Sequence, residues 1–224
     1  IHFRLLVAVA LTLTGVGTAA GCNPLDGEDE AAEDPSSRVG TSARELLSDD
    51  HYKSLVIEIQ AIEGHAPGAE ATQELRQFLE ERINKPSGIR VVVDPPLPPT
   101  GQVAYSVSDI RQIEQKHRKH YSREEQLAAY VLFLDGRSSE DRSNYRTLGQ
   151  SYWNMSVAIF EPSLRGLAAE LGFAPRSIEE IESLVLLHEF GHILGLVNNG
   201  TPLSSPHQDG AHGAHCDNPG CLMH

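Results

Sequence analysis

The sequence predicts an α/β fold, with a mixed, mainly parallel, twisted sheet backed by helices. Three observations lead to this prediction. Short β-rich runs alternate with helical patterns, residues 55–93 have the strand–helix–strand order of a β-α-β unit, and a long helical pattern follows the last strands. The chain has 224 residues, of which 40% are hydrophobic, enough for one compact domain with its own core.

The first half of the domain is predicted from hydrophobic periodicity. The run at 55–62 is rich in β-branched residues and predicts a strand, and 89–93 predicts a second strand that a proline-rich turn closes. Between them, residues 69–84 have apolar side chains at helical spacing: Leu75, Phe78, Leu79 and Ile83.

The middle of the chain continues the alternation. Residues 108–120 predict a helix with a narrow apolar face, and 130–134 a buried strand. Two short strands are predicted next, at 147–153 and 156–160, joined near Asn154.

The N-terminal residues are predicted to be a signal peptide, residues 1–21. One positive charge, Arg4, precedes an uncharged run that ends in small residues directly before Cys22. That junction resembles the lipobox of bacterial lipoproteins, which implies lipidation of Cys22 and anchoring of an exported protein to the cell envelope. The alternative is ordinary signal cleavage, with Cys22 as an incidental thiol.

An acidic tether is predicted at residues 22–40, because this stretch has almost no large apolar side chains to bury. The formal charge of the whole chain is −13, so a basic surface for nucleic acid is excluded, and membrane contact is expected only through a lipid anchor. The folded domain is then predicted over 41–224. The sequence leaves the oligomeric state open.

The last long helix contains the residues suited to catalysis. A capping box at Ser177 and Glu180 opens it, an apolar face leads into His188-Glu-Phe-Gly-His192, and Gly195 is expected to end it. Residues four apart lie on one helical face, so both imidazoles can bind one metal ion while Glu189 addresses a water. The alternative is two surface histidines on an amphipathic helix.

Zn²⁺ is the expected cofactor, since two imidazoles and a third ligand leave one tetrahedral position for water. The metal would lower the pKa of that water toward about 7, and Glu189 would accept its proton as general base. The expected reaction is hydrolysis of a peptide or protein substrate.

These residues resemble the zincin metalloproteases, and more narrowly the metzincins. His188, Glu189, His192 and Gly195 match the H-E-x-x-H-x-x-G signature, but Asn198 stands where that family has its third ligand. The resemblance implies an α+β zincin fold whose short C-terminal loop subdomain contains a Met-turn beneath the metal.

The C-terminal residues are similar to the His-Cys-x4-Cys-x-Met stretch of archaemetzincins. By this resemblance His215 is the third zinc ligand and Met223 forms the Met-turn, after a loop-like insertion at about 197–214. The other candidate ligands past Gly195 remain open, with His207 the runner-up, then His212 and Asp209. Cys216 and Cys221 are expected to form a disulfide in an exported protein, with structural thiols as the alternative.

Two functions follow as hypotheses. The first is a zinc-dependent endopeptidase anchored to the cell envelope, in which the strand near 148–153 is either a substrate-pairing edge or a plain structural strand. The second is a non-catalytic zinc-binding lipoprotein with a zincin fold, which Asn198 favours. The presence of Glu189 favours the enzyme, because a pure zinc binder needs no carboxylate at that position.

Overall fold

The computed structural model describes residues 38–143, 145–172 and 176–224 of the chain. The predicted signal peptide, the predicted lipidation site at Cys22 and most of the predicted acidic tether lie outside these residues. Within the described part, no helix has both the length and the apolar character needed to cross a bilayer.

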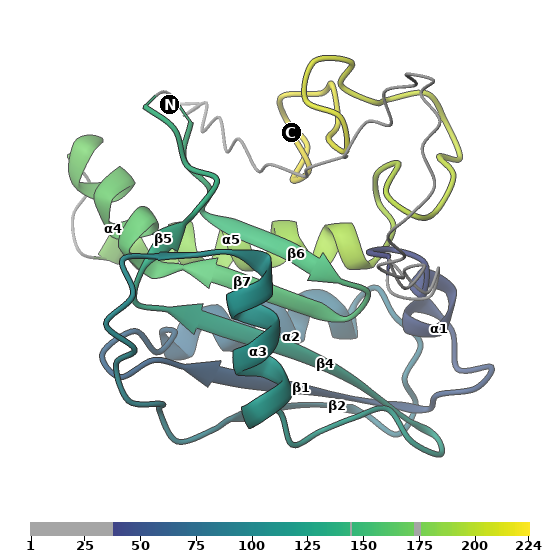
Figure 1. The fold of residues 1–224 in the computed structure, drawn as a ribbon. Coiled ribbons are helices and arrows are strands. Elements are labelled where there is room, and N and C mark those ends of the chain that lie inside the picture. The colour runs from purple at the N-terminus through teal and green to yellow at the C-terminus, as the bar shows by residue number, and fades with distance from the viewer. Residues whose placement is uncertain (1–37, 144, 173–175) are drawn as a thin grey trace, which may run out of the picture.

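The core of the fold is a five-stranded sheet in the order β2-β1-β4-β7-β6 (Figure 1). The first four strands in this order run parallel, and β6 pairs antiparallel with β7 at one edge. The predicted α/β class with a mainly parallel mixed sheet is therefore confirmed. The strands are β1 (Ser54–Ala61), β2 (Ile89–Val93), β4 (Gln126–Leu134), β6 (Gly149–Trp153) and β7 (Ser156–Phe160).

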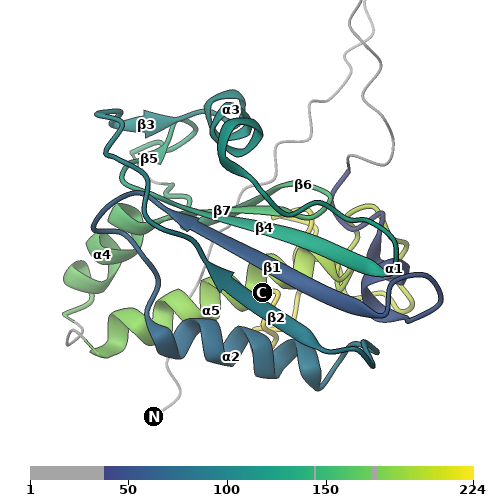
Figure 2. The same ribbon diagram turned by 90° about the horizontal axis from the view of Figure 1, so that it is seen from below.

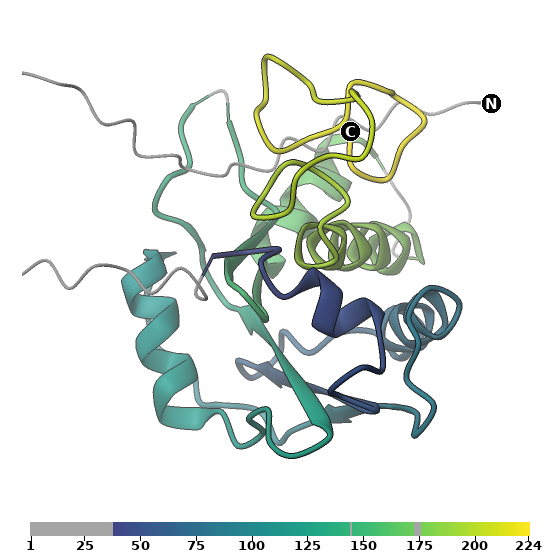
Figure 3. The ribbon, with the colours of Figure 1, turned by 90° about the vertical axis from the view of Figure 1, so that its right-hand side faces the viewer.

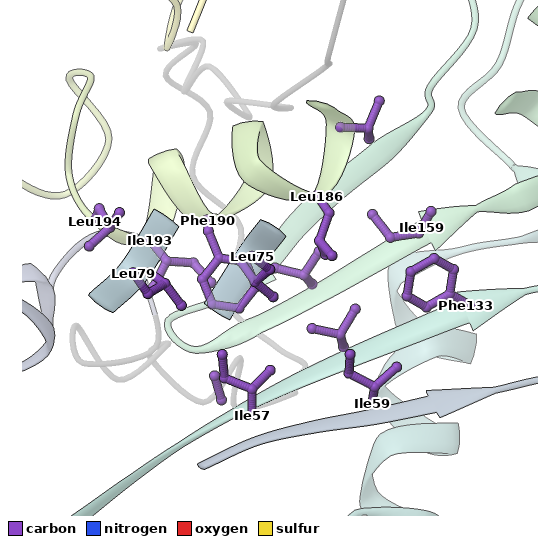
Figure 4. Packing of buried hydrophobic residues seen from close by; sticks show 14 of the residues in the cluster. Ile57, Ile59, Leu75, Leu79, Phe133, Ile159, Leu186, Phe190, Ile193 and Leu194 are labelled. Carbon is purple, nitrogen blue, oxygen red and sulfur yellow. The ribbon is translucent and has the colours of Figure 1, made fainter. Parts of the chain in front are cut away.

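Helices cover both faces of this sheet (Figure 2). On one face lies α3 (Val107–His117); on the other lie α2 (Ala69–Glu80) and α5 (Arg176–Ile193). Apolar side chains of β1, β4 and β7 fill the space between the sheet and the latter pair, against Leu75 of α2 and Phe190 of α5 (Figure 4). Removal of this apolar surface from water is the main favourable contribution to folding.

Most predicted elements occur, with ends that differ by a few residues. The helix predicted at 69–84 ends at Glu80 in the structure, and the strand predicted at 130–134 begins earlier, at Gln126. The last helix begins at Arg176, one residue before the predicted capping residue, Ser177, whose side chain lies outside the description. Four short elements were not predicted: α1 (Ala43–Leu47), β3 (Ala104–Tyr105), β5 (Arg137–Ser138) and α4 (Glu161–Glu170).

The boundary between tether and domain is corrected by the structure. Val39 is 6% exposed and belongs to the main core, and the Gly40 carbonyl accepts a hydrogen bond of 2.6 Å from Thr201 Oγ1. The folded domain therefore includes residues 38–40, which the sequence analysis placed in the tether. A single buried valine beside charged neighbours gives too little periodicity to be recognised as core.

Candidate metal centre

Helix α5 presents two different faces to its surroundings. Phe190 and Ile193 are fully buried against the sheet, whereas His188 and His192 lie on the opposite side. The C-terminal segment covers that opposite side, so α5 is apolar toward the sheet and polar toward this segment (Figure 3). Both histidines lie in the last two turns, where the negative end of the helix dipole favours a cation.

Gly195 ends the helix as predicted. Its φ of 70° is left-handed, and two hydrogen bonds close the end: Leu196 N donates to Gly191 O at 3.0 Å and Gly195 N donates to His192 O at 3.1 Å. This is the Schellman arrangement, which requires a residue that tolerates positive φ. The chain is thereby turned away from the helix axis into the C-terminal segment.

The C-terminal segment, residues 196–224, contains no helix or strand and is held by isolated backbone contacts. Gln208 bridges to Cys216, and Asp209 N donates to His215 O at 2.9 Å. Farther on, Cys216 N donates to Met223 O at 2.6 Å and closes the final turn. These bonds return His215 to the side of α5 that carries the other two histidines.

His188, His192 and His215 form one buried cluster. Their candidate ligand nitrogens all lie within 4.8 Å of one another, and the three side chains are at most 2% exposed. The Nε2 atom of each is buried without a hydrogen-bond partner. Buried polar atoms are rarely left unpaired in native proteins, so three convergent ones indicate a site that could hold a metal ion.

The protonation states also suit metal binding. Burial lowers the pKa of His188 to about 4 and lowers the pKa values of His192 and His215 as well. All three imidazoles are therefore neutral near pH 7, and a neutral ring has a nitrogen lone pair available for a metal.

Backbone carbonyls fix the orientation of two of the rings. His188 Nδ1 lies 2.7 Å from Leu222 O, and His215 Nδ1 lies 2.9 Å from His212 O. A carbonyl oxygen only accepts, so each Nδ1 carries the proton and each Nε2 has the free lone pair. Such carbonyl contacts are typical outer-shell partners of metal-binding histidines.

Glu189 follows His188 directly in α5 and is fully buried. Ser151 Oγ of β6 is 2.9 Å from Glu189 Oε2 and also 2.9 Å from the Glu189 carbonyl oxygen, while Oε1 has no partner. Burial raises the pKa of Glu189 to about 8, although the hydrogen bond from Ser151 lowers it. A carboxylate with this affinity for a proton is suited to accept one near neutral pH.

Met223 packs under α5. A Cβ added at Gly191 would lie 2.2 Å from Met223 Sδ, so the thioether occupies the space that only a glycine leaves on this helix. Met223 is 1% exposed and belongs to a small core cluster with Val197, Ala214 and Cys216. The assignment of Met223 to a Met-turn stays a prediction.

The other candidate ligands do not join the cluster. His212 is bonded to Asp209 through Nδ1 at 2.6 Å, and Asn198 donates to Gln208 Oε1 at 3.1 Å. His207 is not among the clustered histidines, although its carbonyl accepts a hydrogen bond from Asp217 N. Of the four candidate ligands past Gly195 (His207, Asp209, His212 and His215), only His215, the first choice from sequence, lies beside the two histidines of the HExxH motif.

The expected disulfide is corrected. Cys216 and Cys221 are free thiols, and burial raises the pKa of Cys216. The final turn is already closed by the Cys216 N to Met223 O bond and by Cys221 N, which donates to Asn218 O at 2.9 Å. The alternative of structural thiols describes this turn.

Sequence reasoning missed three contributors to the candidate centre: Ser151 and the carbonyls of Leu222 and His212. A serine on a short strand has no distinguishing pattern, and a carbonyl has none at all. A separate cavity of about 360 Å³ lies beside α3, and the cluster residues do not line it. Comparisons with family models, with curated proteins and with solved structures found no match to this chain.

Proposed function

We propose that this protein is a zinc-dependent endopeptidase with a zincin-like fold. The observation that carries the proposal is the fully buried Glu189, which lies between His188 and His192 in α5, together with three convergent histidines whose Nε2 atoms have no partners. A site that only stores a metal ion needs the three ligands but gains nothing from a buried carboxylate with one unpaired oxygen, which is costly to keep.

The three imidazoles fit zinc. They are neutral nitrogen donors, and three protein ligands leave a fourth tetrahedral position open, as in catalytic zinc sites. When bound, zinc supplies Lewis acidity, which activates water near neutral pH and polarises a substrate carbonyl.

Residues of the chain itself orient the ligands and transfer the proton. Leu222 O and His212 O hold His188 and His215 in the tautomer that can bind. Glu189 accepts the proton of the attacking water and returns it to the leaving amine. The raised pKa of Glu189 favours this exchange, because the carboxyl group can be protonated and deprotonated near neutral pH.

Two features support a peptide as substrate. Among the residues that the structure describes, strand β6 is an edge of the sheet and pairs only with β7, and it carries Ser151, which touches Glu189. An extended peptide can add to such an edge through main-chain hydrogen bonds. A peptide bound in this way would present its scissile bond to the proposed base.

The test uses the full-length chain with one equivalent of zinc and fluorescein-labelled casein. Glu189→Ala should bind zinc as tightly as the wild type while losing nearly all hydrolysis, because Glu189 is assigned as base and not as ligand. Zinc binding with no cleavage by the wild type would instead favour the non-catalytic zinc-binding lipoprotein.

Envelope anchoring is part of the same proposal. The small residues before Cys22 are its support, and acylation there would hold the domain at the membrane surface. Lipid mass on the N-terminal peptide of the mature protein is the measurement that checks it.

A further inference from the structure

Strand β6 is shaped around the side chain of Glu189. Gly149 and Ser151 are two residues apart and therefore point to the same face of the sheet, the face that α5 covers. A Cβ at Gly149 would lie 2.9 Å from both Cγ and Oε1 of Glu189. At Ser151 the hydroxyl lies 2.9 Å from Oε2.

We propose that Ser151 is a positioning residue for the general base of the proposed peptidase. Its hydroxyl hydrogen is shared between Oε2 and the carbonyl oxygen of Glu189, which leaves Oε1 as the oxygen that accepts a proton, while Gly149 leaves the room that this side chain needs. The inference rests on the proposed function and adds a residue that neither binds the metal nor touches the reacting atoms.

The chemistry of the contact explains why a serine is suited to this position. A glutamate has three side-chain torsions, and a base must be held close to its reactive geometry to be efficient. Ser151 is 2% exposed, so no bulk water can replace its hydroxyl as donor. With alanine at this position, the Glu189 carboxylate would lose the hydroxyl donor and keep only its backbone hydrogen bond to residue 151.

The protein contains a matched control for this hydrogen bond. Ser156 of β7 donates to Glu114 Oε1 at 2.8 Å, and Ser156 is 1% exposed. Glu114 belongs to α3, so this pair lies on the face of the sheet opposite to the histidine cluster. Ser156→Ala thus removes a buried serine–glutamate bond of similar length without touching the metal centre.

The first experiment compares the full-length wild type, Ser151→Ala and Ser156→Ala, each loaded with zinc, on fluorescein-labelled casein. Ser151→Ala should lower kcat by about ten- to a hundredfold, the scale expected for a displaced catalytic group. Its KM and zinc dissociation constant should stay within about twofold of the wild type. Ser156→Ala should leave kcat unchanged within the same range.

The second measurement is independent of activity. Urea unfolding of the metal-free wild type, Ser151→Ala, Glu189→Ala and the double variant gives a double-mutant cycle. If the hydroxyl holds Glu189, the second substitution should cost less stability once the first has been made. Additive losses would show that the two side chains are not coupled and would overturn the assignment.

The outcomes separate this inference from the proposed function. Cleavage by the wild type with an equal kcat for Ser151→Ala refutes the positioning role alone. Loss of zinc in Ser151→Ala also refutes it, since the serine would then shape the metal site. If the wild type binds zinc and cleaves nothing, the peptidase proposal fails, and the role of Ser151 fails with it.

Discussion

Replacement of Gly191 by alanine would disturb the packing of Met223 against α5. The new Cβ would lie 2.2 Å from Sδ and 3.1 Å from Cε of Met223. The favourable van der Waals separation of such non-bonded atoms is about 3.5–4.0 Å, so the sulfur must move by about 1.5 Å. Met223 is 1% exposed, and its backbone carbonyl is bonded to Cys216 N, so the turn has little freedom to absorb the shift.

Two opposing effects set the change in stability. Overpacking of a buried site lowers the stability of the fold by about 1–3 kcal/mol, whereas a change from glycine to alanine inside a helix raises it by about 1 kcal/mol. The net loss should lie between about 0 and 2 kcal/mol. The larger effect is on the metal, because Leu222 precedes Met223 and its carbonyl orients His188. Disturbance of such an outer-shell partner lowers metal affinity by about ten- to a hundredfold.

The assay is zinc affinity by chelator competition, together with urea unfolding of the metal-free protein. Gly166→Ala is the matched control, because Gly166 also lies inside a helix, α4, and its added Cβ would meet Arg146 only at 3.5 Å or more. That variant should gain up to about 1 kcal/mol and bind zinc normally. A Gly191→Ala protein with wild-type zinc affinity would refute the coupling between Met223 and His188.

Three further predictions concern other parts of the chain. His215→Ala should weaken zinc binding by about tenfold or more and His207→Ala by less than about twofold, measured by chelator competition; the reverse order would move the third ligand into the insertion. Burial, and then the nearby charge of Glu161, raises the pKa of Glu182 from 4.5 to about 7. The folded state therefore binds this proton more tightly than the unfolded state does, and the contribution of Glu182 to the stability of the fold is lost as the pH rises from 4.5 to about 7. Glu182→Gln should therefore raise stability relative to the wild type at about pH 8 more than at about pH 5 in urea unfolding, and an equal effect at both pH values would contradict the shift. Cys22→Ser should move the protein out of the detergent-soluble membrane fraction, and unchanged fractionation would favour ordinary secretion.

Much of the sheet could be predicted because its strands have strong local signals. The β-α-β unit has β-branched runs, and the buried strand and the hairpin near Asn154 have apolar or aromatic runs next to turn residues. Helix α4 was missed although Pro162 near its start and Leu164, Leu167 and Ala168 have helical spacing. Its ten residues follow β7 without a loop, so no turn signal marks where the strand ends.

The sequence alone determined the part of the metal centre that depends on backbone geometry. His188 and His192 share a helical face because any α-helix brings residues four apart together, and Gly195 ends the helix because glycine tolerates positive φ. No distant contact is needed for either inference. The glutamate between the histidines is placed by the same rule.

Only the tertiary structure decided which distant groups complete the centre. His207, His212 and His215 all lie in one loop-like segment, where closure entropy hardly distinguishes one position from another. The bonds of Asp209 N to His215 O and of Cys216 N to Met223 O select His215. Ser151 meets Glu189 across 38 positions of sequence, and that contact exists only because α5 packs on the edge strand β6. Both contacts depend on packing between elements, and such packing produces no periodic pattern in a sequence.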